Sequence, residues 1–222
     1  MKCKMQCVRY FGGNNASPER VMEGQARTVV YQKGETLFKQ GAFANEVACI
    51  SSGLLKIQLM GHKNNKTIVR ISAPGELTGL EALTGQEVYA CSAIAMKTTT
   101  LCLMQAGFIK QLMQRYPGSQ EMFFSALGNS QRQLNDKIAQ LSMHQTRGRL
   151  AQALLYLNQP AFVNEQIFNY ITRKEIAALA GMSMESITKI LRDFKQDGLI
   201  ALQNGKIRLK CPNDLQELAT RN

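Results

Sequence analysis

The sequence of 222 residues lacks several features that would point to catalysis or to a membrane. It has no tryptophan and only two histidines, and these lie in unrelated segments, where a lone histidine is more often a surface residue than a metal or haem ligand. It has no P-loop pattern, no G-x-S-x-G and no H-E-x-x-H. No apolar run reaches the length that spans a bilayer. These absences argue against an enzyme and against a membrane protein.

The N-terminus and the cysteines bear on the compartment. The first residues, Met-Lys-Cys-Lys-Met-Gln-Cys, lack the apolar core of a signal peptide, so we expect a cytoplasmic protein. The six cysteines stand at positions 3, 7, 49, 91, 102 and 211. In a reducing compartment they are expected to be free thiols, metal ligands or redox sensors rather than structural disulfides.

Positive charge is in excess over the whole chain. A formal net charge of +11 and a pI near 9.5 suit a polyanionic partner such as nucleic acid. From residue 144 onward, 11 basic and 7 acidic residues give a net charge of +4, so the first 143 residues carry the other +7. Bulk charge therefore indicates the chemistry of a partner but not the surface that binds it.

The segment 171–192 has the pattern of two short helices joined by a tight turn. Thr172 can cap the first helix, and Glu175, three residues later, can bond back to the N–H of the cap. Gly181 stands where the chain must turn, and Ser183 can cap the second helix. This spacing predicts a helix-turn-helix.

The residues that follow support this interpretation over an ordinary pair of packed helices. Two short alternating runs, 199–202 and 206–210, flank Asn204-Gly205, which is a strong hairpin signal and here predicts a wing. Ala177 and Gly181 are small where two helices would cross closely. The sequence therefore predicts a winged helix-turn-helix that binds double-stranded DNA.

The N-terminal half has a different periodicity. Between residues 27 and 104, short alternating runs such as 55–59, 67–71 and 92–96 are separated by glycines, which predicts a sandwich or jelly roll. Before it, we expect an irregular arm over residues 1–16 and a short helix that begins near Ser17.

Helical patterns connect the two halves. A helix is predicted from Ala106 and, after Pro117, a long helix to about residue 143. A linker helix over 147–158, a weakly stranded connection over 160–169 and a terminal helix over 214–219 complete the chain. We expect an α+β protein in three parts: an N-terminal arm and jelly-roll effector or sensor domain over 1–116, a dimerisation helix over 117–145 and a winged helix-turn-helix domain over 146–222.

The long helix carries a coiled-coil pattern. Six positions at alternating spacings of three and four, which we call the dimerisation seam, are Phe124, Leu127, Gln131, Leu134, Ile138 and Leu141. The alternative is that this stripe packs only on the chain's own β domain. Two full heptads with one polar residue at an a-type position favour a helix pair, so we expect a homodimer.

A jelly roll, a long helix and a winged helix in this order resemble the Crp/Fnr superfamily of bacterial transcription regulators. The motifs that carry the resemblance are Lys33-Gly-Glu-Thr-Leu-Phe-Lys-Gln-Gly41, Ile50-Ser-Ser-Gly53, Pro74-Gly-Glu-Leu-Thr-Gly-Leu-Glu81, Arg147-Gly-Arg-Leu-Ala151, Ile171-Thr-Arg-Lys-Glu175 and Glu185-Ser-Ile-Thr-Lys-Ile-Leu191. The resemblance implies a regulator that binds DNA as a dimer and works with RNA polymerase.

The second helix of the helix-turn-helix is the expected reader of bases. The residues expected at the DNA are Thr172, Arg173, Lys174, Ser183, Met184, Glu185, Ser186, Thr188 and Lys189. Glu185 can accept from cytosine N4, and Lys189 can donate to guanine O6 and N7. By analogy with the family, Arg173 and Thr188 contact phosphate or flanking groups. The resemblance implies a palindromic site of TTGA-type half-sites.

The effector of the β domain cannot be named from the sequence. The resemblance implies an effector pocket with Leu77, Gly79, Leu80, Glu81, Tyr89 and Cys91 in its wall. Family members that bind cyclic AMP hold its phosphate with an arginine in this segment, but no arginine or lysine stands between Arg70 and Lys97. The sequence therefore argues against cyclic AMP.

The Fnr branch of the family is closer in this segment, and it holds an iron–sulfur cluster with four cysteines. Cys102 falls at the position of that branch's distal ligand, and Cys3 and Cys7 lie in the N-terminal arm, but the spacing C-x3-C has no third cysteine before Cys49. Cys102 is equally consistent with a small residue in a strand core. A cluster or a haem stays an alternative, as does a ligand-binding or redox-sensing module on Cys3, Cys7 and Cys102 that does not read DNA.

Overall fold

The computed structural model describes residues 24–61, 65–143, 145–203 and 205–220. The expected N-terminal arm, the short helix near Ser17, and Cys3 and Cys7 lie outside the described residues. Contacts divide the chain into two compact units. One consists of residues 1–64 and 70–133 and is called the β unit here; the other consists of residues 65–69 and 134–222 and is called the winged-helix unit.

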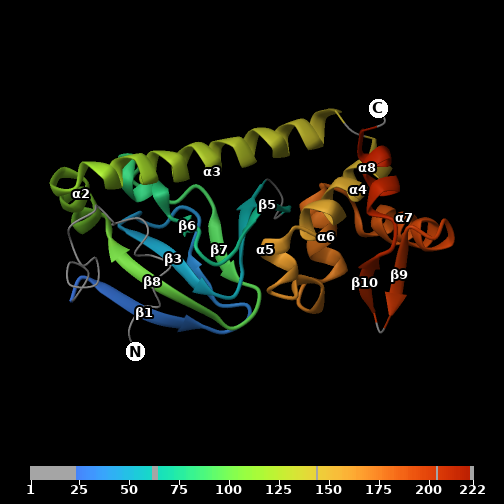
Figure 1. The fold of residues 1–222 in the computed structure, drawn as a ribbon, viewed down its shortest axis with the longest axis horizontal. Helices are drawn as coiled ribbons and strands as arrows, with labels where there is room; N and C mark the ends of the chain where they lie inside the picture. Colours follow the sequence, from blue (N-terminus) through green and yellow to red (C-terminus); the bar gives the residue numbers. More distant parts are fainter. Residues whose placement is uncertain (1–23, 62–64, 144, 204, 221–222) are drawn as a thin grey trace. The chain divides into compact units, whose positions relative to one another are not determined.

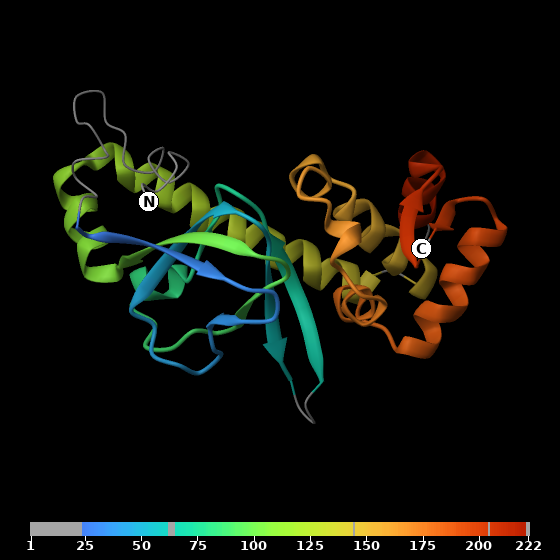
Figure 2. The same cartoon turned by 90° about the horizontal axis from the view of Figure 1, so that it is seen from below.

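The β unit contains the predicted sandwich (Figures 1 and 2). The described strands of the sandwich, of which residues 66–69 of β5 group by contacts with the winged-helix unit, are β1 Ala26–Tyr31, β2 Thr36–Phe38, β3 Glu46–Ser52, β4 Leu55–Met60, β5 Lys66–Ser72, β6 Leu77–Thr78, β7 Ser92–Ala95 and β8 Thr99–Gln105. They form two four-stranded sheets, in the orders β1-β8-β3-β6 and β2-β7-β4-β5. β8 pairs antiparallel with both β1 and β3, and β7 with both β2 and β4. The expectation of a β-rich domain in this part of the chain is confirmed.

Apolar side chains from both sheets form one core. Val47, Ile50, Leu55 and Leu101 are at least nine-tenths buried, and the core extends to Phe123 of the long helix. Burial of side chains of this size is the main favourable term in folding, at about 1.5 to 3 kcal/mol each. The core therefore joins the first part of the long helix to the sandwich.

Two helices follow β8. They are α2 Ala106–Arg115 and α3 Pro117–Met143, as predicted, and a short 3-10 helix, η3 Leu80–Leu83, lies earlier in the β unit. The break falls at Tyr116, with φ −127° and ψ 88°, because proline disfavours helical geometry in the residue before it and is tolerated at the first position of a new helix. The contacts of α3 assign 117–133 to the β unit and 134–143 to the winged-helix unit, so a separate dimerisation segment over 117–145 stays a prediction.

The winged-helix unit is built from helices and one hairpin. Its elements are α4 Thr146–Leu157, α5 Pro160–Val163, the 3-10 helix η4 Ile167–Asn169, α6 Arg173–Ala180, α7 Met184–Gln196, β9 Ile200–Gln203, β10 Lys206–Leu209 and α8 Pro212–Thr220. β9 and β10 pair antiparallel, with Gln203 opposite Lys206, which confirms the wing. No described helix is long and apolar enough to cross a membrane.

One prediction about this unit was wrong. The connection over 160–169 is not stranded but consists of α5 and η4. Pro160 stands at the start of α5, where its missing N–H costs nothing, and Phe162 is buried with its ring centroid 4.9 Å from that of Tyr156. A tertiary contact of one aromatic side chain therefore stabilises a helical turn that the polar local sequence does not indicate.

Candidate functional site

The two helix starts of the helix-turn-helix have the predicted caps. Thr172 Oγ1 accepts the backbone N–H of Glu175 at 3.2 Å, and the Glu175 carboxylate accepts the backbone N–H of Thr172 at 2.8 Å. Ser183 Oγ accepts the N–H of Ser186 at 3.1 Å. Gly181 between them has φ +62°, a left-handed conformation that favours glycine. These local bonds fix where α6 ends and α7 begins.

The inner and outer faces of α6 and α7 differ as expected. The larger apolar side chains of the two helices and one alanine are buried, namely Ile176, Leu179, Ala180, Ile187, Ile190 and Leu191. On α7, Glu185, Thr188 and Lys189 are exposed, and Met184 is 44% exposed. Arg173 and Lys174 are exposed in the first turn of α6. A polar face at the N-terminal end of α7 is therefore open for contact with a partner.

Hydrogen bonds already made limit what some of these side chains can do. Thr172 Oγ1 also donates to the Glu175 carboxylate, and Ser183 Oγ donates to Ser186 Oγ, so the proton of each cap hydroxyl is already used in a hydrogen bond. Thr188 Oγ1 donates to the carbonyl of Met184 at 2.7 Å. A hydroxyl has one proton, and phosphate offers only acceptors. Direct contact of Thr172, Ser183 and Thr188 with DNA stays a prediction, and a bond to phosphate would require each to give up its present acceptor.

The wing adds three exposed cations that were not among the predicted DNA contacts. Along β10 and the residue after it, Lys206, Arg208 and Lys210 are exposed, whereas Ile207 between them is buried. Successive residues of a strand point to opposite faces, so the three cations share one face. The alternation of this segment was visible in the sequence and could have identified them as candidate phosphate contacts.

Arg147 of α4 anchors the second helix. Its guanidinium lies 2.8 Å from the Asp197 carboxylate and 3.6 Å from that of Asp193, and it stacks over the ring of Phe194 with 5.2 Å to the centroid. All three partners lie in the last turns of α7 or at its end. The exposed ion pairs contribute little individually to stability. Together with the ring contact they fix the direction of α7 within the winged-helix unit.

The last turns of α3 pack on the turn of the helix-turn-helix. Lys137 Nζ donates to the carbonyl of Leu179, near the end of α6, and to Gln140 Oε1 at 3.1 Å. Leu141 covers the turn so closely that a Cβ on Gly181 would overlap Leu141 Cδ2. A positive charge at a helix C-terminus is favourable, because the last carbonyls lack helical partners. Any movement of this end of α3 would therefore act directly on the turn before α7.

Lys137 makes the stability of this contact depend on pH. Burial lowers the pKa of Lys137 from 10.5 to about 8. The unfolded chain therefore binds this proton more tightly than the folded one, and the contribution to stability is constant below about pH 8, rises with pH up to about 10.5 and is constant above. Between about pH 7.5 and pH 9.5, the free energy of unfolding of the wild type should therefore rise by about 2 kcal/mol relative to that of Lys137→Met.

Urea unfolding at equal protein concentration under reducing conditions, followed by circular dichroism, measures this difference. Lys195→Met is the matched control, because Lys195 is an exposed lysine of the same unit, and it should show the pH dependence of the wild type. Equal pH dependence in the wild type and in Lys137→Met would contradict the assignment.

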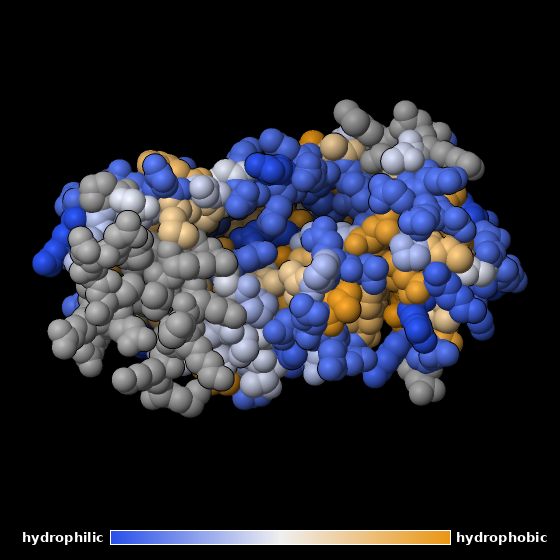
Figure 3. All heavy atoms as spheres, viewed as in Figure 1, coloured by the Kyte–Doolittle hydropathy of each residue, from blue (hydrophilic) through white to orange (hydrophobic). Residues whose placement is uncertain are grey.

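The dimerisation seam lies partly open on the single chain. Phe124 is 63% exposed, Ile138 62% and Leu134 38%, and Gln131 between them is exposed too. Figure 3 shows apolar atoms at the surface along α3, at the upper edge of the view, between hydrophilic ones. Leu127 packs against the β core and Leu141 against the helix-turn-helix turn, as described above. Phe124, Leu134 and Ile138 thus form an exposed apolar stripe that contains the polar Gln131, whereas Leu127 and Leu141 are half-buried within the chain.

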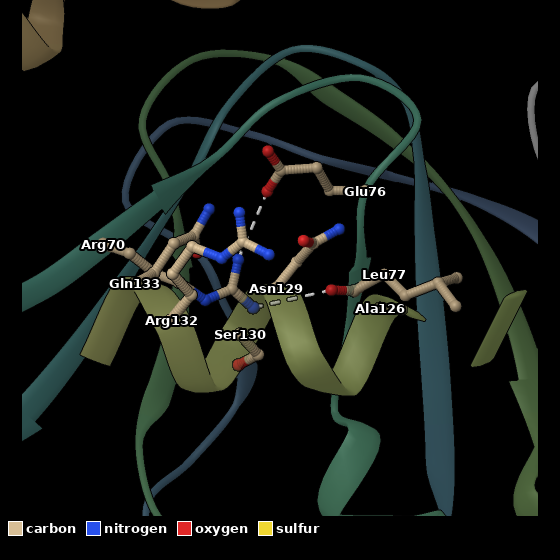
Figure 4. A pocket seen from close by; sticks show the side chains of 8 residues that line it. All are labelled: Arg70, Glu76, Leu77, Ala126, Asn129, Ser130, Arg132 and Gln133. Atoms are coloured by element: carbon tan, nitrogen blue, oxygen red, sulfur yellow. Dashed lines mark hydrogen bonds and ion pairs between the residues drawn. The ribbon is translucent and has the colours of Figure 1, made fainter. Parts of the chain in front are cut away.

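The β unit has a cavity between its strands and α3. It measures about 260 Å³ and is lined by Arg70 of β5, by Glu76 and Leu77 at the start of β6, and by one stretch of α3, 126–133. Figure 4 shows Arg70 and Glu76 joined at this cavity, next to polar side chains of α3. The Arg70 Nη1 to Glu76 Oε2 distance is 3.3 Å, and Arg70 Nη1 also donates to Ser72. Of the six residues expected in an effector pocket, the lining of this cavity includes Leu77 alone.

The other five predicted pocket residues lie outside the lining of this cavity, and their place in an effector pocket stays a prediction. Tyr89 is buried, stacks on Phe38 at 4.2 Å and bonds the backbone of Glu46 through its hydroxyl. Gly79 approaches the same ring so closely that a Cβ would lie 2.6 Å from it. The remaining three are the buried Leu80 and the half-buried Glu81 and Cys91. Burial, followed by the nearby Glu81 carboxylate, raises the pKa of the Cys91 thiol, so it is not activated as a nucleophile.

The described cysteines do not gather around a metal. Cys102 of β8 stands opposite Cys49 of β3, and both are fully buried in the sandwich core. No group of three or more histidine, cysteine, aspartate or glutamate side chains with metal-binding geometry occurs among the described residues. An iron–sulfur cluster needs four thiolates in one place. The surroundings of Cys102 fit a core residue, and the other candidate cluster ligands, Cys3 and Cys7, lie outside the described residues.

Comparison with known proteins agrees with this architecture. The family model of the cyclic nucleotide-binding domain matches residues 28–116, and that of the Crp-like helix-turn-helix domain matches residues 148–218. The fumarate and nitrate reduction regulatory protein of Escherichia coli is 26% identical over 197 residues, covering 86% of this chain and 78% of that protein. The cyclic AMP receptor protein of Thermus thermophilus is 26% identical over 190 residues, covering 86% and 87%. The structure of FixK2 from Bradyrhizobium japonicum matches the fold with a TM-score of 0.77 at 16% identity, covering 89% of this chain and 98% of that one. The chain belongs to the Crp/Fnr family of DNA-binding transcription regulators.

Proposed function

We propose that this regulator is a cytoplasmic homodimer that reads a two-fold symmetric DNA site and is controlled by a signal sensed in its β unit. The observation that carries the proposal is the capped helix-turn-helix, in which Glu185 and Lys189 stand exposed on one face near the start of α7. This end of a recognition helix enters the major groove in helix-turn-helix proteins. Exposed Arg173 and Lys174 and the cations of the wing supply charge for the phosphates on either side.

The open stripe of α3 supports the homodimer. An apolar stripe on a long helix is stabilised by burial against a second helix, and a two-fold axis along the seam lets the same stripe serve both chains. A symmetric dimer presents two copies of α7, which is the arrangement that reads a palindrome. The seam also explains why Phe124 and Ile138 are apolar although they are exposed on one chain.

The path from signal to DNA would run along α3. Its first part contributes Phe123 to the core of the β unit, and its last turns hold the helix-turn-helix turn through Lys137 and Leu141. A signal can shift this helix only if it binds two conformations of the protein unequally. The regulator would then act on transcription through RNA polymerase, without catalysing a reaction itself.

Retention on duplex DNA at increasing salt separates this function from its alternative. A protein that neutralises several phosphates should lose affinity steeply and linearly on a double logarithmic plot. A ligand-binding or redox-sensing module on Cys3, Cys7 and Cys102 would show no DNA retention even at low salt. Its thiols would instead react in a peroxide titration.

Cyclic AMP is not expected to be the signal. The segment between Arg70 and Lys97 has no cation for a buried phosphate. Calorimetry with the purified protein should show no cyclic AMP binding at micromolar concentrations. The Thermus thermophilus cyclic AMP receptor protein, titrated in the same buffer, is the positive control. A dissociation constant in the micromolar range or below for this chain would overturn the prediction.

A further inference from the structure

The cavity of the β unit combines one buried cation with one exposed cation. Arg70 is only 8% exposed and reaches the cavity from β5, whereas Arg132 lies on the exposed side of α3. The single carboxylate in the lining is that of Glu76. Two guanidinium groups and one carboxylate leave an excess of positive charge at a site that α3 partly closes (Figure 4). An anion is the ligand that balances this charge.

The bond between Arg70 and Glu76 is long for an ion pair, whereas Arg70 Nη1 also donates a short bond to Ser72 Oγ. Arg70 Nη1 is 3.3 Å from Glu76 Oε2, and Arg70 Nη2 is 3.5 Å from the carbonyl of Leu77. Charge-assisted bonds of this kind are usually 2.7 to 2.9 Å long, at about twice the strength of neutral ones. The guanidinium has five N–H donors in a planar fork, which matches the two oxygens of a carboxylate or phosphate. Glu76 thus occupies Arg70 without satisfying it fully, and an oxyanion could replace it.

The rest of the lining suits a small polar ligand. Asn129, Ser130 and Gln133 of α3 offer amide and hydroxyl donors, and Leu77 and Ala126 are the apolar members. None of the described residues that line the cavity is aromatic, so it offers no ring on which a purine or pyrimidine could stack. A volume of about 260 Å³ lies near the lower end of small-molecule sites, which begin at about 300 Å³.

We propose that this cavity binds a small carboxylate or phosphate anion through Arg70 and Arg132, with Glu76 as an internal competitor for Arg70. The anion would bridge a strand of the β unit and α3, which is the helix that carries the dimerisation seam. Its role as the sensed signal rests on the proposed function, but its binding does not. If Glu76 competes with the anion for Arg70, removing the Glu76 carboxylate should tighten anion binding. A purely structural ion pair gives no such expectation.

Calorimetry on the full-length protein without DNA tests the proposal with inorganic phosphate and succinate as probes. Glu76→Gln should tighten binding about tenfold, because Arg70 loses its competing carboxylate. Arg132→Gln should weaken binding by about fivefold, as expected for one exposed charge. Lys110→Gln, which removes an exposed cation of the same unit outside the cavity, should leave it unchanged. The probe that binds more tightly identifies the carboxylate or the phosphate as the recognised group.

Three results would overturn the proposal. The first is that neither anion binds to the wild type or to Glu76→Gln at millimolar concentrations. The second is that Glu76→Gln leaves anion binding unchanged or weakens it, and the third is that cyclic AMP binds more tightly than both small anions. Circular dichroism of each variant verifies that it is folded. DNA retention of the same samples reports on the proposed function separately, so the anion site can fail while the regulator assignment stands.

Discussion

Replacing Leu134 and Ile138 together by glutamate should turn the dimer into a monomer and abolish specific DNA binding. Both side chains lie in the exposed part of the seam, at 38% and 62% exposure. In a symmetric helix pair the change would bring four carboxylates into one apolar interface, where unpaired charges cost several kcal/mol each. A monomer holds one half-site instead of two. Affinity for the palindrome should fall by about a thousandfold or more, toward the non-specific level.

Sedimentation equilibrium measures the mass of the variant, and fluorescence anisotropy with labelled duplex measures its affinity. Ser125→Glu is the matched control, because Ser125 is exposed on the same helix but lies outside the seam. It should stay dimeric and keep its affinity. If Leu134→Glu with Ile138→Glu left both the mass and the DNA affinity unchanged, α3 would not be the interface.

Glu185→Ala and Arg173→Ala should weaken DNA binding in two different ways. Glu185 can only accept, so it discriminates in favour of cytosine N4 at one position. Its loss should relax the preference for one G·C pair by about 1 to 3 kcal/mol, which is about five- to 150-fold. Arg173 stands exposed in the first turn of α6 and would contact phosphate. Its loss should weaken all sequences alike and reduce the salt slope by about one unit.

A panel of duplexes with single base-pair changes, measured at several salt concentrations, separates the two effects. Lys195→Ala is a suitable control, since Lys195 is an exposed cation in the last turn of α7, at the other end from Glu185. It should leave the base preference unchanged and should alter the salt slope by only a small fraction. Unchanged discrimination by Glu185→Ala at every base pair would show that this end of α7 is not the reader.

The helix-turn-helix could be predicted from the sequence because its determinants are local. Thr172 and Glu175 are three residues apart and bond each other, and Gly181 adopts the left-handed conformation that few other residues tolerate. The wing was equally accessible through the Asn204-Gly205 pair between two alternating runs. Each of these signals involves side chains and backbone groups that are close in the chain, so no tertiary information was needed.

The cavity could not be predicted, because its parts are far apart in the chain. Arg70 comes from β5 and Arg132 from α3, and only the packing of the long helix on the sandwich brings them to one place. The expectation relied on a segment near Gly79 and Tyr89, whose glycine and aromatic ring turn out to pack on Phe38. These two residues therefore contribute to core packing, and their place in an effector pocket stays a prediction.

The seam shows a similar limit. Heptad spacing identified Leu141 and Ile138 as equivalent, but Leu141 covers Gly181 of its own chain and Ile138 is open. Lys137, between the seam positions, escaped notice because a lysine on a long helix is usually solvated. Its burial and its bond to the Leu179 carbonyl arise from the packing of α3 on α6. Periodicity therefore gives the faces of a helix but not the partner of each face.

A binding-site selection from random duplex DNA with the purified wild-type protein tests the central claim most directly. A homodimer that presents two copies of α7 should enrich an inverted repeat, with TTGA-type half-sites whose centres lie about 34 to 36 Å apart, one turn of the double helix. Each half-site should contain one G·C pair at which Glu185→Ala loses its preference. Enrichment of a motif without two-fold symmetry, or of no motif at all, would contradict the assignment of this protein as a dimeric, sequence-specific regulator.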